Sequence, residues 1–125
     1  MPVRSLSSSV LKWPNAKTVD CAVHSWAKKI VQHREGVQRI GYFGSYARGD
    51  WGVGSDLDLI IVVTDSQLSF TTRRVNWGAT ELPVPADILV YTEHEWRSLT
   101  RQGRFAHTIA KEAVWVFVHE KTPNS

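Results

Sequence analysis

The sequence predicts a single α/β (α+β) domain, in which a small mixed sheet of about four strands is flanked by helices. Three observations predict this fold. The chain has 125 residues, which is near the commonest size of one domain. Its 42% hydrophobic and 22% charged residues are ordinary fractions for a globular domain that buries its own core. Finally, segments of helical periodicity alternate along the chain with short runs of β-branched residues.

The first predicted elements are a long helix and a strand. Apolar residues recur at i, i+3, i+4 and i+7 from Val19 to Val31, which predicts a one-faced helix. We expect Thr18 to cap its N-terminus and Gly36 to end it. Residues 37–43 then predict a strand that breaks at Gly44-Ser45.

A short helix and a buried strand are expected next. Residues 46–48 can form a helical turn before a loop punctuated by glycines. Residues 56–63 predict a second strand, whose β-branched run indicates burial on both faces. The stretch from 65 to 83 has little periodicity, and within it we expect a poor helix over residues 68–77.

The C-terminal part predicts a strand, a helix and a final strand. Residues 84–91 form the third expected strand. Thr92 and Glu95 have the spacing of a capping box, which predicts a helix running to residue 113 that Gly103 weakens in its middle. Residues 114–118 predict a short last strand.

Composition and charge exclude several classes of protein. Cys21 is the single cysteine, so neither an intrachain disulfide nor a cysteine-based zinc site can form. The net charge of +3 and the pI of about 9.2 mildly favour an anionic partner. The longest apolar run is too short to span a membrane, and the N-terminus lacks the apolar segment of a secretory signal. We therefore expect a cytoplasmic protein without a membrane partner. The charge alone does not rank nucleotides, nucleic acids and acidic proteins as the anionic partner, and a nucleic acid is not the partner that we expect.

Two acidic residues carry the strongest chemical signal. Asp56 and Asp58 flank Leu57 in a predicted strand, so their carboxylates project from the same face. Paired carboxylates repel each other unless a hard cation lies between them, which predicts a magnesium site. Asp87 begins the next strand along the chain and joins this site if the two strands are neighbours. Asp87 is then a metal ligand and a candidate general base for an acceptor hydroxyl.

A phosphate-binding loop is predicted ten residues before this pair. Gly44 and Ser45 follow a strand and open a short helix, where backbone N–H groups and a hydroxyl can hold phosphate. Arg48 can steady a phosphate or the transition state. The alternative for Arg48 is an ion pair with Asp50 or another surface acid. Together with the carboxylates, these groups are the parts required for nucleotidyl transfer.

These motifs resemble a known family. The segments from Gly44 to Asp50, from Ser55 to Leu59 and from Ala86 to Ile88 resemble the signature of the DNA polymerase beta-like nucleotidyltransferases, and more closely the minimal nucleotidyltransferases (MNT). The resemblance covers about residues 37 to 118 and implies the nucleotidyltransferase fold. It also implies that Asp56, Asp58 and Asp87 bind magnesium, and that Gly44 and Ser45 hold the phosphates of a nucleoside triphosphate.

The resemblance further implies a biological role. MNT proteins act as antitoxins that transfer AMP from ATP to a tyrosine of a HEPN-type ribonuclease toxin. Two alternatives stay open: a nucleotidyltransferase acting on a small alcohol such as an aminoglycoside, and a non-catalytic antitoxin that neutralises its toxin by contact alone. We expect the nucleotidyltransferase domain to span residues 15–120, between tails at 1–14 and 121–125, and both a homo-oligomer and a hetero-oligomer are compatible with the sequence.

Overall fold

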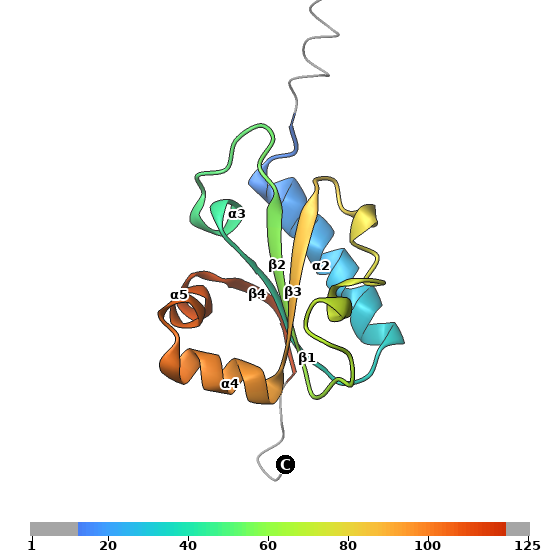
Figure 1. Ribbon diagram of the computed structural model, residues 1–125. Coiled ribbons are helices and arrows are strands. Elements are labelled where there is room, and N and C mark those ends of the chain that lie inside the picture. Colours follow the sequence, from blue (N-terminus) through green and yellow to red (C-terminus); the bar gives the residue numbers. More distant parts are fainter. Residues whose placement is uncertain (1–12, 120–125) are drawn as a thin grey trace, which may run out of the picture.

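A four-stranded mixed sheet forms the centre of the domain, as the sequence predicts (Figure 1). The computed structural model describes residues 13–119. The strand order is β3-β2-β1-β4, with β1 antiparallel to both β2 and β4, and β2 parallel to β3. The strands are β1 Val37–Phe43, β2 Leu57–Val63, β3 Ala86–Thr92 and β4 Val114–Val118. The first and last agree with the predicted bounds.

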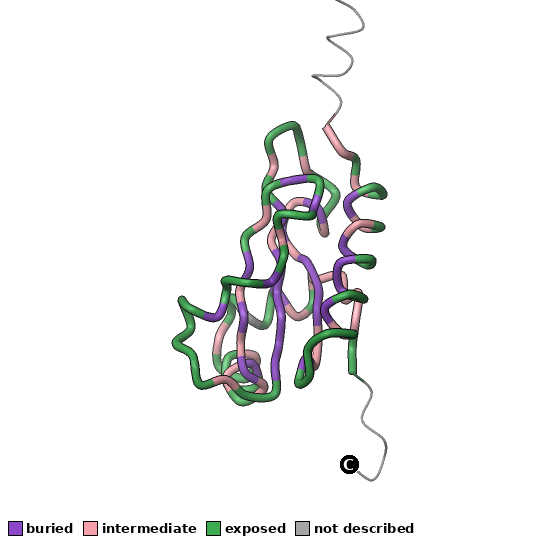
Figure 2. The backbone as a smooth tube through the Cα atoms, turned by 90° about the vertical axis from the view of Figure 1, so that its right-hand side faces the viewer, coloured by how far each residue is buried: buried purple, intermediate pink, exposed green. Residues whose placement is uncertain are grey.

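Helices cover both faces of this sheet (Figures 1 and 2). Alternate residues of β2 belong to two separate apolar clusters. Leu57, Leu59 and Ile61 pack with the buried side of α2, Ala16–His33. Ile60 and Val62 pack with Trp96 of α4, Glu93–Gln102, and with Ile109 of α5, Arg104–Glu112. Because side chains alternate along a strand, Asp58 shares the face that α4 and α5 cover.

The boundaries of α2 differ from the prediction at both ends. Asn15 is the N-cap, and its Oδ1 accepts a hydrogen bond of 2.8 Å from the backbone N–H of Thr18. The assignment of Thr18 as the cap was therefore wrong: Thr18 lies inside the first turn and supplies the donor. The helix ends at His33 because Arg34 already has an extended backbone, and Gly36 lies in the following turn with a φ of +81°.

The single helix predicted near the C-terminus is divided into two helices, α4 and α5. The capping box is confirmed, since Thr92 Oγ1 accepts from the Glu95 N–H and Glu95 Oε1 accepts from the Thr92 N–H. The continuous helix to residue 113 was wrong, because Gly103 adopts φ −99° and ψ 127° and separates α4 from α5. Glycine is a poor helix former, and here its extended backbone redirects the chain.

The helix expected over residues 68–77 is absent from this described segment, and two 3₁₀ turns occur in the longer stretch from 65 to 83 instead. They are η1, Thr72–Arg74, and η2, Ala79–Glu81. Asn76 has a positive φ of +66°, which is incompatible with a continuing helix. Trp77 is nonetheless buried, and its carbonyl accepts from Trp26 Nε1 at 2.8 Å. This segment therefore extends the layer formed by α2.

Two further expectations concern the chain as a whole. Within residues 13–119 no helix has both the length and the apolar character needed to cross a bilayer. The predicted tails lie outside the described residues except for Trp13 and Pro14.

Candidate active site

Three neighbouring strands bring the predicted site residues together at one end of the sheet. Phe43, the last residue of β1, pairs with Asp58 near the start of β2. Because β2 and β3 are parallel, their first residues meet at the same edge, and Asp58 pairs with Asp87. Strand β3 is thus the neighbour of β2, which is the condition under which we expected Asp87 to join the site. Asp56 immediately precedes β2 rather than lying within it.

Gly44 is required by both its backbone and its neighbour. It precedes α3, Ser45–Arg48, with φ +79° and ψ −151°, a conformation that residues with a Cβ rarely adopt. A Cβ added to Gly44 would collide with Oδ2 of Asp58 and would lie 3.3 Å from its Cγ. The loop after β1 therefore packs its backbone directly against the Asp58 carboxylate.

The electrostatics of Asp58 reflect this crowding. Burial raises the pKa of its carboxyl group, and the neighbouring carboxylates of Asp87 and Asp56 raise it further. Arg48 acts in the opposite direction on the same pKa. The site therefore concentrates negative charge, which a bound cation would neutralise.

An open cleft of about 530 Å³ joins the loop, the carboxylates and α5. On one side it is lined by Gly44, Ser45, Arg48, Asp56 and Asp58. On the other side it is lined by α5, through Phe105, Thr108, Ile109 and Glu112. Asp87 is not among the lining residues, although it lies beside Asp58 in the sheet. Within the described residues, no three side chains of His, Cys, Asp or Glu are gathered closely enough to coordinate one ion.

Arg48 makes two ion pairs at the rim of the cleft. Its Nε lies 3.1 Å from Oδ2 of Asp50, and its Nη1 lies 3.3 Å from Oε1 of Glu112. The pair with Asp50 is the alternative that the sequence left open for this residue. Both carboxylates raise the pKa of Arg48, so the guanidinium stays charged.

Glu112 is a site residue that sequence reasoning missed. Its Oε1 accepts the backbone N–H of Gly44 at 2.8 Å as well as the Arg48 contact. These two donors are among those predicted to bind phosphate. Glu112 lies 68 residues from Gly44, at the end of α5, and nothing in its local sequence distinguishes it from a solvated helix acid.

Comparison with known proteins identifies the family. The family model described as the nucleotidyltransferase domain matches residues 24–116, which includes the whole cleft. The chain belongs to the nucleotidyltransferase domain family. The resemblance seen in the Gly44 and Asp56 motifs is thereby confirmed at the level of the family. None of the functionally curated proteins matches the sequence significantly.

Solved structures support the fold of this nucleotidyltransferase domain. A protein from Sulfolobus solfataricus, assigned as a nucleotidyltransferase, is 23% identical with a TM-score of 0.54, over 88% of this chain and 93% of that one. A toxin-antitoxin structure with AMP-PNP is 17% identical with a TM-score of 0.55, over 78% and 74% of the two chains. A mutant of the toxin-antitoxin MntA-HpeT is 15% identical with a TM-score of 0.52, over 77% and 72%.

Aromatic residues pack against α3, the short helix that follows Gly44 in this nucleotidyltransferase domain. The ring of Tyr46 in α3 stacks on Trp51 at 5.5 Å between centroids, with an interplanar angle of 8°. The Tyr46 hydroxyl accepts a hydrogen bond of 2.7 Å from Trp13 Nε1. Tyr46 is itself buried, so these contacts fix the orientation of α3 and of the two residues before it.

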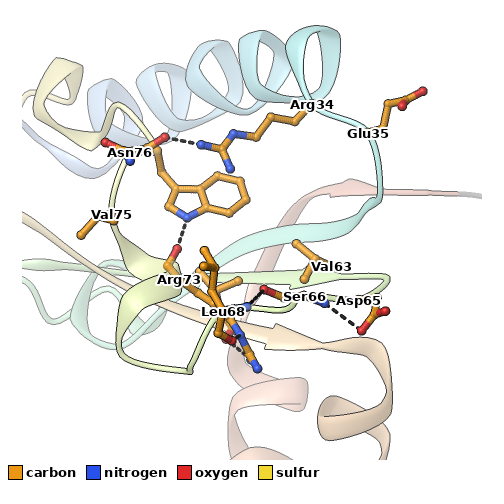
Figure 3. A pocket seen from close by; sticks show the side chains of 11 residues that line it. Arg34, Glu35, Val63, Asp65, Ser66, Leu68, Arg73, Val75 and Asn76 are labelled. Carbon is orange, nitrogen blue, oxygen red and sulfur yellow. Dashed lines mark hydrogen bonds between the residues drawn. The ribbon is translucent and has the colours of Figure 1, made fainter.

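A second cavity, of about 330 Å³, lies at the opposite end of β2 (Figure 3). There the Arg34 guanidinium lies 3.8 Å from the centroid of the Trp77 ring and donates to the Asn76 carbonyl. Arg73 is only 9% exposed, and it donates to both carboxylate oxygens of Glu95. The guanidinium groups of Arg34 and Arg73 in this cavity thus have partners within the protein, so we assign the cavity a structural role.

Proposed function

We propose that this nucleotidyltransferase domain transfers AMP from ATP to a hydroxyl group and releases pyrophosphate. The observation that carries the proposal is the juxtaposition of Asp58 and Asp87 in the β2–β3 register, against the backbone of Gly44. Nucleotidyl transfer requires carboxylates and a phosphate-binding loop on the same cleft, and this arrangement supports both.

Magnesium is the proposed cofactor, held by Asp56, Asp58 and Asp87. The residues fit it, because carboxylate oxygens are the donors that magnesium prefers and because, besides burial, the neighbouring carboxylates of Asp87 and Asp56 raise the pKa of Asp58. Asp58 and Asp87 are paired in the register of β2 and β3, and Asp56 immediately precedes β2, so all three carboxylates belong to the same end of the sheet. When bound, the ion would neutralise phosphate charge.

The remaining roles follow from the position of each residue in the cleft or, for Asp87, beside it. We assign Gly44 N–H, the Ser45 hydroxyl and Arg48 to the phosphates of ATP. The acceptor oxygen forms a bond to the α-phosphorus while the bond from that phosphorus to the pyrophosphate oxygen breaks. Asp87 is exposed beside Asp58, and we assign it as the base that takes the acceptor's proton.

A partner protein is the proposed source of the acceptor. Asp56 and Asp87 are exposed, and so is Phe105 at the rim of the cleft, with 62% of its surface accessible. The described residues therefore leave the acceptor side of the cleft open. This fold occurs in toxin-antitoxin structures, one of which contains AMP-PNP. These likenesses support an antitoxin that modifies a tyrosine of a HEPN-type toxin.

Mass spectrometry of the toxin tests this proposal. Incubating the toxin with this protein, ATP and magnesium should add the mass of one or more AMP groups to a toxin tyrosine, and ribonuclease activity should fall over the same time course. Asp56→Asn should abolish both effects. Asp50→Asn is the matched control, because Asp50 is an exposed acid outside the cleft lining, and it should retain both.

Two outcomes would replace the proposal by its alternatives. Toxin inhibition without a mass change, persisting in Asp56→Asn, indicates an antitoxin that acts by contact alone. Transfer of AMP to an aminoglycoside or another small alcohol, without modification of the toxin, indicates a small-molecule nucleotidyltransferase.

A further inference from the structure

Glu112 accepts hydrogen bonds from two donors that we assign to the nucleotide phosphates, Gly44 N–H and the Arg48 guanidinium. One of its oxygens, Oε1, accepts from Gly44 N–H at 2.8 Å and from Arg48 Nη1 at 3.3 Å. A carboxylate oxygen and a phosphate oxygen both carry negative charge and both accept such hydrogen bonds. The same two donors cannot bind Glu112 and a phosphate oxygen in the same positions.

The remainder of α5 places Glu112 on the cleft. Phe105, Thr108, Ile109 and Glu112 are spaced at i, i+3, i+4 and i+7, so they form one face of the helix, and all four line the cavity. Glu112 is only partly exposed, at 21% of its side chain. The contact with Gly44 thus comes from a helix that forms the cleft wall, and not from a mobile surface acid.

The charge around Glu112 makes the contact dependent on its two donors. Arg48 is the cationic side chain that acts on the pKa of Asp58, and the other charged groups that act on it, Asp87, Asp56 and Glu112, are carboxylates that raise it. In the absence of an anion, its carboxylate stabilises the loop by satisfying the buried Gly44 N–H. A triphosphate that enters the cleft must displace it.

We infer that Glu112 is an internal competitor of the nucleotide phosphates, and that its displacement sets the affinity of the domain for ATP. The inference rests on the proposed function, because it takes ATP as the ligand of this cleft. When only a fraction of a protein is in its binding-competent state, its apparent dissociation constant is the intrinsic constant divided by that fraction. Removing the competing carboxylate should therefore strengthen ATP binding, whereas removal of a residue that merely supports a site would weaken it.

Calorimetric titration of the full chain with ATP and with inorganic triphosphate tests the inference. Glu112→Gln should lower the dissociation constant of both ligands about tenfold, the effect of losing one charge-assisted contact. Asp50→Asn is the matched control, since it also removes a carboxylate from Arg48 but leaves the Gly44 N–H bonded to Glu112. It should change the dissociation constants much less. Thermal unfolding without ligand checks that each variant is folded.

Glu112→Asp separates occupancy from simple repulsion. The shorter side chain keeps its charge but withdraws its carboxylate from the Gly44 N–H, so ATP should bind more tightly to this variant too. An Asp variant that binds ATP as the wild type does, beside a tighter Gln variant, would mean that Glu112 acts only through long-range charge. That result overturns the inference.

Two other results have different consequences. If the wild-type protein transfers AMP in the mass assay but Glu112→Gln binds ATP no more tightly than the wild type does, the inference alone is overturned. If neither protein binds ATP or triphosphate and no transfer occurs, both the inference and the proposed function fail.

Discussion

Replacing Gly44 by alanine should separate the stability of the domain from its chemistry. The added Cβ meets the Asp58 carboxylate, and the backbone at φ +79° and ψ −151° is one that alanine rarely adopts. Gly49 offers a matched control, because it also has a positive φ of +88° but an added Cβ there meets nothing within 4 Å. Both substitutions strain the backbone, and one of them also displaces a site residue.

The expected magnitudes follow from this geometry. Backbone strain should cost about 1–3 kcal/mol of unfolding free energy at Gly44 and about 1–2 kcal/mol at Gly49. In a chain of 125 residues each kcal/mol lowers Tm by roughly 4 °C. The collision at Gly44 involves the end of the Asp58 side chain, which can rotate away. The two variants should therefore lose similar stability, while only Gly44→Ala moves a carboxylate of the proposed magnesium site.

Thermal unfolding and calorimetric titration of ATP with magnesium measure the two effects. We expect both variants to be folded at about 10–20 °C, which is near the typical temperature of maximum stability, and the titrations are done there. Gly44→Ala should then lose magnesium-dependent ATP binding, and Gly49→Ala should keep it within a few-fold. Equal ATP affinity in the two variants would contradict this prediction, since it would show that the close approach of Gly44 to Asp58 has no role in binding.

The other predictions concern single side chains. Asp58→Asn and Asp87→Asn should each abolish magnesium-dependent ATP binding in titrations. Without metal at neutral pH, Asp58→Asn should be slightly more stable than wild type, because its raised pKa means that wild-type stability falls as pH rises through it. Ser45→Ala should weaken ATP binding roughly tenfold, and Ser45→Glu far more. Glu95→Gln should lose about 1 kcal/mol in urea unfolding at neutral pH, because Arg73 lowers the pKa of the 38% exposed Glu95. That loss should shrink as pH falls through the lowered pKa.

The strands could be predicted well because their signals are local. Residues 37–43 and 114–118 are bounded by glycine or by a helix end, and both agree with the structure. The break at Gly103 could not be placed, because a glycine inside a helical pattern is compatible with both a weakened helix and an extended residue. The irregular segment before β3 is held by burial of Trp77 against α2, a tertiary contact with no local pattern.

The candidate site was predictable to the extent that it lies on consecutive elements. Gly44, Asp56 and Asp58 are close in sequence, and Asp87 needed only the assumption that β2 and β3 are neighbours. Glu112 lay beyond such reasoning, because its contact with Gly44 depends on how α5 returns across the end of β1. Helix periodicity predicts which residues share a face, but it does not predict which loop that face will meet.

A crystal structure of the full chain with magnesium and a non-hydrolysable ATP analogue would show whether the cleft between Gly44 and α5 binds the nucleotide. We expect the triphosphate on Gly44, Ser45 and Arg48, and magnesium at the carboxylates near the start of β2 and β3. We also expect Glu112 to be turned away from the Gly44 N–H. Nucleotide bound instead in the cavity beside Arg34 and Trp77, with the carboxylates free of metal, would contradict these expectations.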